Sequence, residues 1–210
     1  MAPARRTVSE MIGENTPITE IAQALDAMDA QTRWSQFQSM GRSDMRELYA
    51  RAEASAPLTL DDFVPHGVPS RVPVVHRGRN SLPLPQSQRF FSKVMCRPEG
   101  QDDRLFGFND APLGWMLGPG YYIAVPTAGE SAWEARGSVV VDYFRVPDGP
   151  VAPGWPRVRA NWVGLQVLVY HRTRDFMRRV SSQVTIGAAY KAERKLDHYF
   201  ILVREDPEAE

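Results

Sequence analysis

The chain has 210 residues, of which 43% are hydrophobic and 24% charged, an ordinary globular profile that excludes disorder of the whole chain. Its formal net charge is zero and no apolar run approaches the roughly 18 residues of a membrane-spanning helix, so neither a membrane nor a nucleic-acid partner is expected. A single cysteine, Cys96, excludes an internal disulfide and fits the reducing interior of a bacterial cell, which predicts a cytoplasmic protein.

Residues 1–15 are expected to form a disordered tail. Arg5 and Arg6 suggest a twin-arginine export signal, but the residues that follow contain two acids and lack the apolar segment that such a signal needs. The last four residues, 207–210, are predicted to form a second, acidic tail. Neither tail is expected to contribute to the folded core.

Residues 16–56 are predicted to form three short helices. Thr16 suits the position before the first helix, and an apolar stripe follows at steps of three and four residues: Ile18, Ile21, Leu25 and Met28. Asp29 is expected to cap the second helix, and the third begins at Ser43 and ends before Pro57. This segment holds four Arg against six acidic residues, whereas a DNA-binding segment needs a basic face, so nucleic acid is not an expected partner.

Residues 57–206 are predicted to form a β-rich body. The stretch 57–156 contains 14 of the 17 prolines, which excludes long helices. Eight short strands are predicted, at residues 72–76, 89–97, 104–108, 121–125, 138–146, 165–171, 184–190 and 198–204. One late helix is predicted at 174–180. The expected fold class is α+β: a three-helix N-terminal layer packed on an antiparallel barrel or sandwich, the two forming one cooperative domain.

The body also holds most of the aromatic residues and a surplus of positive charge. Of 21 aromatic residues, 17 lie between Phe90 and Phe200. Residues 1–70 carry 6 basic and 10 acidic side chains, whereas residues 71–206 carry 19 basic and 13 acidic ones. This asymmetry predicts either attraction between the two regions or a basic pocket for an anionic ligand. A barrel of about eight strands is just wide enough to fill with side chains or to hold one small ligand.

Motifs for metals, nucleotide cofactors and covalent catalysis are not found in the sequence. The four histidines lack the spacing of metal ligands, and neither a P-loop nor a G-x-G-x-x-G occurs, so no metal and no cofactor are expected. Cys96 lies in a predicted strand without an obvious base and is expected to be a buried, unreactive thiol. Trp155, in a loop rich in proline and glycine, is expected to cover an edge of the core.

Three histidines are candidates for a site because each falls at the end of a predicted strand. His76, His171 and His198 could converge in space, although unrelated strand-end histidines are the simpler interpretation. Asp142 or Asp175 would then complete the site. His171 and Asp175 lie four residues apart, which suits either a histidine held by a carboxylate or an acid that complements a helix N-terminus.

Positive charge gathers at the predicted junction of the strand 165–171 and the helix 174–180. The basic residues there are Arg172, Arg174, Arg178 and Arg179, and a guanidinium can hold a carboxylate or phosphate through two parallel hydrogen bonds. The leading hypothesis is therefore a protein that binds a small anionic or aromatic ligand, or a partner, in an aromatic cavity that carries Arg174. Two alternatives stay open: a cofactor-independent enzyme with a His/Asp acid–base pair in that cavity, and a scaffold or homo-oligomer.

Overall fold

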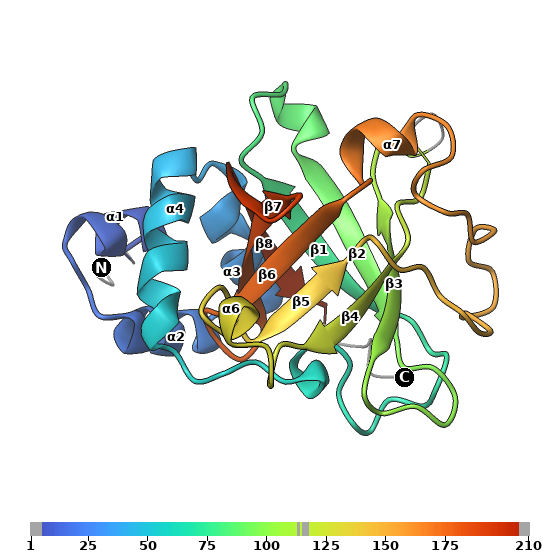
Figure 1. Ribbon diagram of the computed structural model, residues 1–210. Coiled ribbons are helices and arrows are strands. Elements are labelled where there is room, and N and C mark those ends of the chain that lie inside the picture. Colours follow the sequence, from blue (N-terminus) through green and yellow to red (C-terminus); the bar gives the residue numbers. More distant parts are fainter. Residues whose placement is uncertain (1–5, 113, 115–117, 206–210) are drawn as a thin grey trace.

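Eight antiparallel strands form a closed barrel, in which each strand pairs with the next in sequence and β8 closes the ring on β1 (Figure 1). The computed structural model describes residues 6–112, 114 and 118–205. The strands are β1 (Val74–Asn80), β2 (Phe90–Cys96), β3 (Leu105–Asp110), β4 (Tyr122–Pro126), β5 (Val139–Asp142), β6 (Thr173–Arg179), β7 (Val184–Lys191) and β8 (Arg194–Arg204). The predicted α+β class with an antiparallel β-rich body is confirmed, and the body is a barrel rather than a sandwich.

Side chains alternate between the interior of the barrel and its outer face, because successive residues of a strand point in opposite directions. The register places Lys93 of β2 opposite His76 of β1, so both side chains lie on the same, inward face. The interior is so narrow that an aromatic side chain on one strand lies over the backbone of the neighbouring strand. A Cβ atom on Gly107 would lie 2.5 Å from the Tyr122 ring, so this position requires glycine.

One end of the barrel interior is filled by apolar side chains. These include Val74, Met95, Leu105, Ala124, Val139, Val141, Met177 and Leu202. A short helix, η2 (Leu60–Asp62), lies at this end, and Leu60, Phe63 and Val64 pack into the same cluster. The segment before β1 therefore closes this part of the barrel, which we call the packed end.

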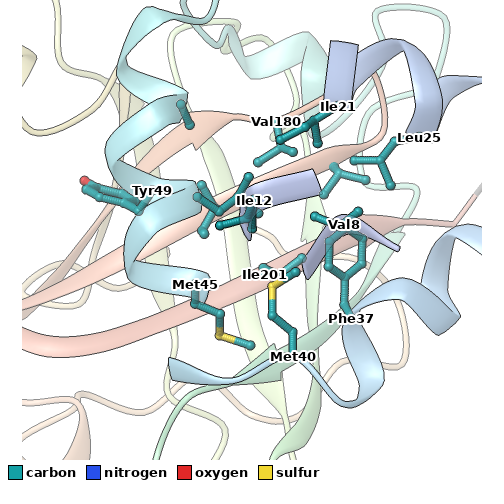
Figure 2. Packing of buried hydrophobic residues seen from close by; sticks show 14 of the residues in the cluster. Val8, Ile12, Ile21, Leu25, Phe37, Met40, Met45, Tyr49, Val180 and Ile201 are labelled. Carbon is teal, nitrogen blue, oxygen red and sulfur yellow. The ribbon is translucent and has the colours of Figure 1, made fainter. Parts of the chain in front are cut away.

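Four N-terminal helices cover the outer face of the barrel at β7 and β8 (Figure 1). They are α1 (Val8–Gly13), α2 (Ile18–Asp26), α3 (Ala30–Gln38) and α4 (Arg42–Arg51). Their apolar side chains form one buried cluster with the outward residues of the two strands, part of which Figure 2 shows. Those strand residues are Val184, Ile186, Ala188, Tyr199, Ile201 and Val203. The helices and the barrel thus bury a common core.

The expectation that residues 1–15 form a disordered tail is wrong for α1. Val8 and Met11 are buried in the helical cluster, and Thr7 with Glu10 forms a capping box at the start of the helix. The sequence pattern misses this helix because six residues are too few to display a period. The predicted tail residues 1–5 and 207–210 lie outside the described residues.

Cap predictions for the helices are right in one case and wrong in another. Asp29 caps α3 as predicted, its Oδ1 accepting a hydrogen bond from the Thr32 backbone N–H at 2.9 Å. Thr16 does not cap α2, which begins after Pro17 without a capping side chain. The remaining described helices are short: η1 (Ala52–Ala54), η3 (Gln86–Gln88), α6 (Ser131–Glu134) and α7 (Gln166–Val169). Across the described ranges, no helix has the length and apolar character needed to cross a membrane.

Two neighbouring predictions are reversed. The segment 165–171, predicted as a strand, contains α7 and a turn, and the segment 174–180, predicted as a helix, lies almost wholly in β6. Both faces of β6 are covered: Met177 packs inside the barrel, while the ring of Phe176 packs outside against Trp133. Because apolar residues lie on both sides, the strand lacks the alternation by which a half-buried strand is recognised.

Ion pairs join the acidic N-terminal region to the basic barrel, as one interpretation of the charge asymmetry predicts. The guanidinium of Arg178 lies 3.1 Å from the Glu53 carboxylate and donates to the Tyr49 carbonyl at 2.9 Å. That of Arg179 lies 2.6 Å from the Asp62 carboxylate. Part of the positive surplus of the body is therefore neutralised within the fold.

The outer face of β2, β3 and β4 is covered by the loop that follows β5. The ring of Trp155 lies 5.0 Å from that of Phe108, and Cys96 is fully buried in a cluster with Ala152. The expectations that Trp155 covers the core and that Cys96 is buried are confirmed. Burial raises the pKa of the Cys96 thiol to about 11.

Candidate functional site

The end of the barrel opposite the packed end contains a cavity of about 510 Å³. Its lining residues come from the ends of β1, β3 and β7, the starts of β2, β6 and β8, the loop between β1 and β2, and α7. Apolar and aromatic side chains form most of the wall, among them Leu82, Leu84, Phe91, Tyr143, Tyr170 and Phe200. We call this part of the barrel the open end.

A lysine and a carboxylate meet at the floor of the cavity. Lys93 of β2 and Asp175 of β6 both line it, and their side chains are only 2% and 7% exposed. Lys93 Nζ lies 3.4 Å from Asp175 Oδ2. It also donates hydrogen bonds to Asn109 Oδ1, at 2.9 Å, and to the Tyr143 hydroxyl. Three polar side chains thus converge on one amine.

Aromatic rings surround the same amine. Nζ of Lys93 lies 4.7 Å from the centroid of the Tyr122 ring, 5.0 Å from that of Tyr143 and 5.1 Å from that of Phe200. The faces of such rings attract a cation, but they also exclude water from it. The amine therefore sits in a low-dielectric environment beneath the cavity.

Further contacts hold the floor in place. Asn109 Nδ2 donates to the Gly120 carbonyl at 3.1 Å and to the Tyr143 hydroxyl at 3.0 Å. The Tyr143 ring stacks on that of Tyr170, with centroids 5.3 Å and planes 20° apart. Because these residues come from different strands and loops, closure of the barrel sets the geometry of the site.

Burial favours the uncharged form of both ionisable groups. It lowers the pKa of Lys93 and raises the pKa of Asp175, and the attraction between the two groups opposes each shift. Burial also raises the pKa of the Tyr143 hydroxyl well above its ordinary value, so this hydroxyl stays protonated at neutral pH. The site therefore pairs an amine with a carboxyl group that can take its proton, beside a phenol that can donate a hydrogen bond.

Three of the residues singled out from the sequence lie inside the barrel. Asp175 and His198 line the cavity, and His198 is partly buried, which lowers its pKa. His76 is fully buried toward the packed end, where its Nε2 lies 3.1 Å from the Phe63 carbonyl. Burial lowers the pKa of His76 to about 3. In the cavity, Asp175 thus contacts a lysine rather than a histidine.

The other three predicted residues lie away from the cavity. Asp142 and Arg174 face outward on β5 and β6, where the Arg174 Nε lies 3.3 Å from Asp142 Oδ1. The Arg174 guanidinium also stacks 4.2 Å from the Phe144 ring centroid and pairs with Glu193. His171 lies in the turn before β6. The predicted strand-to-helix junction is absent from this segment, so the expected helix N-terminus at Asp175 is absent too.

Sequence reasoning missed Lys93, Asn109 and Tyr143. One feature of the sequence indicates that Lys93 points inward. It lies two residues from Phe91 and two from Met95 in an apolar strand, so it shares their face. A second is its rarity, because only three of the 25 basic residues are lysines and two of them, Lys93 and Lys191, line the cavity. Asn109 and Tyr143 carry no comparable signal.

Comparison of the chain with protein-family models, with curated proteins and with solved structures gives no match. Within residues 6–112, 114 and 118–205, no group of three or more His, Cys, Asp or Glu side chains is placed to hold a metal ion.

Proposed function

We propose that the protein binds one small, largely apolar or aromatic molecule in the open end of the barrel, with a polar group of the ligand directed at Lys93. The observation that carries this proposal is the cavity of about 510 Å³ with a buried polar cluster at its floor. Sites for small molecules typically measure about 300–1,000 Å³ and combine apolar walls with a few polar groups that orient the ligand.

The cost of the polar floor supports this function. A buried ion pair is seldom more stable than apolar side chains of similar volume, because both charges lose their hydration. The same barrel fills its packed end with apolar residues. Contact with a bound ligand therefore explains the Lys93–Asp175 pair better than a contribution to stability does.

A matched pair of fluorescent probes tests the proposal. N-phenyl-1-naphthylamine is neutral, and 1-anilinonaphthalene-8-sulfonate carries a sulfonate on a closely similar ring system. We expect the neutral probe to bind with one site per chain. The cavity-filling variant Ala189→Phe should abolish this binding, because Ala189 lines the cavity. Lys195→Met serves as the control, since Lys195 lies over Tyr49 and Tyr199 on the outer face.

The comparison of probes also decides the charge of the ligand. Tighter binding of the sulfonate would restore the expectation of an anionic ligand. Equal binding of the neutral probe by wild type and Ala189→Phe, with Ala189→Phe folded by circular dichroism, would contradict a site in this cavity.

Self-association is the second candidate, and one observation favours it. Large apolar side chains are exposed near the cavity in the segment 162–169: Trp162, Val163, Leu165, Val167 and Val169. The apolar stripe of the N-terminal helices, by contrast, is buried on the barrel. Sedimentation of wild type and Trp162→Ser at several concentrations tests this candidate, and a wild type that stays monomeric would contradict it.

We also propose a cytoplasmic location in a bacterial cell. The support is chemical, because the only cysteine is a free, buried thiol that has no bond to lose in a reducing compartment. Fractionation of cells that express the full chain with an epitope tag tests it, and recovery in an extracytoplasmic fraction would contradict it.

A further inference from the structure

Lys93 is a primary amine placed where a bound ligand would meet it. Its side chain is 2% exposed, yet it lines the cavity, so the small exposed part faces the empty space rather than bulk solvent. The other two lysines differ: Lys191 lies at the end of β7 and is half-buried, and Lys195 is exposed. Among the three lysines, Lys93 alone is deeply buried, whereas Lys191 lines the cavity away from the floor cluster and Lys195 lies on the outer face.

The charge at the cavity floor limits the chemistry of the ligand. Lys93 and Asp175 together carry no net charge. This holds both for an ammonium beside a carboxylate and for a neutral amine beside a carboxylic acid. A carboxylate ligand would add a second anion beside Asp175 in a low-dielectric site, where repulsion between like charges is strong. A neutral polar group, such as a carbonyl, adds no charge and can accept hydrogen bonds from the groups present.

We propose that Lys93 forms a Schiff base with the carbonyl group of an aldehyde or ketone held in the cavity. This inference rests on the proposed ligand-binding function and names the class of ligand. The geometry that carries it is the convergence of Asp175, Tyr143 and Asn109 on the amine nitrogen beneath apolar walls.

The reaction is balanced by groups that the site contains. Asp175 takes a proton from the ammonium group, which leaves a lone pair on Nζ. Nζ then forms a bond to the carbonyl carbon, the C=O double bond becomes a C–O single bond, and the oxygen receives the proton held by Asp175. Asp175 next takes a second proton from the nitrogen and passes it to the same oxygen, which leaves as one water molecule. The nitrogen lone pair forms the C=N bond, so the product is a protonated Schiff base, Asp175 is again a carboxylate, and no oxidant or reductant is needed. Tyr143, which contacts Nζ, is placed to donate a hydrogen bond to the departing oxygen.

The environment of Lys93 favours this reaction over simple binding of a cation. Only the neutral amine attacks a carbonyl, and burial lowers the pKa of Lys93, which increases the neutral fraction at neutral pH. The apolar walls also limit the access of water that would hydrolyse the product. Lysines that act through Schiff bases in other proteins are activated by the same means.

Reductive trapping with a matched pair of ligands tests the inference. The full chain is incubated at neutral pH with 2-naphthaldehyde and sodium cyanoborohydride, and the modified residue is located by peptide mass spectrometry. We expect the adduct to form first on Lys93, because burial lowers the pKa of its amine and so increases the fraction that is neutral at neutral pH. The rate at Lys93 should reach its plateau at a lower pH than the rates at the other two lysines.

Substitutions distinguish the contribution of the Lys93 amine from that of the neighbouring residues. Lys93→Met should remove the adduct, whereas Lys195→Arg, on the outer face, should leave the rate at Lys93 unchanged. Tyr143→Phe keeps the ring that stacks on Tyr170 and should slow formation of the adduct by removing the hydroxyl. An adduct spread equally over the three lysines of the wild type would overturn the inference without any variant.

The closely similar alcohol, 2-naphthylmethanol, distinguishes failure of this inference from failure of the proposed function. It has the same ring but no carbonyl, so it reports noncovalent binding by displacing N-phenyl-1-naphthylamine. If the alcohol binds and the aldehyde is not trapped on Lys93, the cavity binds ligands but the Schiff base is refuted. If neither the alcohol nor the fluorescent probe binds, the proposed function itself fails.

Discussion

The two ends of the barrel interior are built from the same strands but differ in what occupies them. At the packed end, side chains such as Leu105 and Met177 fill the space and the η2 segment closes it. At the open end, the strands carry Lys93 and Asp175 and leave a cavity of about 510 Å³. We infer from this difference that one end stabilises the fold, whereas the other retains a costly polar pair because it contacts a ligand.

Asp175→Asn should have the largest effect, because it leaves the Lys93 amine without its carboxylate. Breaking a buried pair costs about 3–5 kcal/mol of unfolding free energy when the remaining charge stays buried. Urea unfolding followed by circular dichroism at neutral pH measures the loss. The double variant Lys93→Met/Asp175→Asn should recover most of it, since neither charge remains. A double variant as unstable as the single one would show that the pair is needed for the fold itself.

Acid should destabilise the protein through His76, which is buried toward the packed end. The folded-state pKa is about 3, against an ordinary value of 6.5. Above pH 6.5 the imidazole is neutral in both states, and its contribution to stability is fully present. As the pH falls from 6.5 toward 3, the unfolded chain takes up a proton that the folded chain does not, so stability is lost, by roughly 4 kcal/mol in all.

The variant His76→Gln isolates this contribution. It should flatten the fall in unfolding free energy between pH 6.5 and 3, whereas His66→Gln, at an exposed loop residue, should leave the fall unchanged. An unaltered pH dependence in His76→Gln would show that carboxylates elsewhere in the chain cause the acid sensitivity.

A pair of leucine variants compares the two ends directly. Leu105→Ala at the packed end should cost about 3 kcal/mol of unfolding free energy, because it leaves a void in a fully buried cluster. Leu84→Ala at the open end should cost less, because Leu84 is half-buried beside a cavity that is already present. For N-phenyl-1-naphthylamine, Leu84→Ala should change the binding affinity more than Leu105→Ala does. If Leu105→Ala weakens probe binding more than Leu84→Ala does, the two ends are not independent.

The smallest effect is expected at Cys96, which lies outside both ends, under the loop that follows β5. The thiol is fully buried and its pKa is raised to about 11, so a thiol reagent should label the native protein slowly and the urea-unfolded protein at once. Cys96→Ser should shift the unfolding free energy only slightly compared with the variants above. Rapid labelling of the native chain would show that this loop opens.

Local sequence signals predicted most of the elements but not the exchange of a helix and a strand near β6. Seven of the eight predicted strands overlap an observed strand, because proline and glycine bound them and β-branched or aromatic residues fill them. Prediction failed where tertiary structure covers both faces of a segment. In β6, Met177 faces the interior and Phe176 faces Trp133, so burial does not alternate.

The candidate site was predicted only in part, because its members are brought together by contacts that are distant in sequence. Asp175 and His198 were expected near a ligand and do line the cavity. The contact between Lys93 and Asp175 was not predictable, because the two residues are 82 positions apart and meet only when the barrel closes. Arg174 was expected in the site, but the strand places it on the opposite face from Asp175, its neighbour in sequence.

By itself, the sequence determined the class of fold, the helical N-terminal layer and the inward apolar face of alternating strands such as β5, because these depend on periodicity over a few residues. Only the tertiary structure decided that the sheet closes and that η2 fills one end while the other stays hollow. It alone also made Lys93 a cavity residue rather than a surface charge. Closure has this effect because it converts the inward face of every strand into one shared interior, whose polarity no single strand reveals.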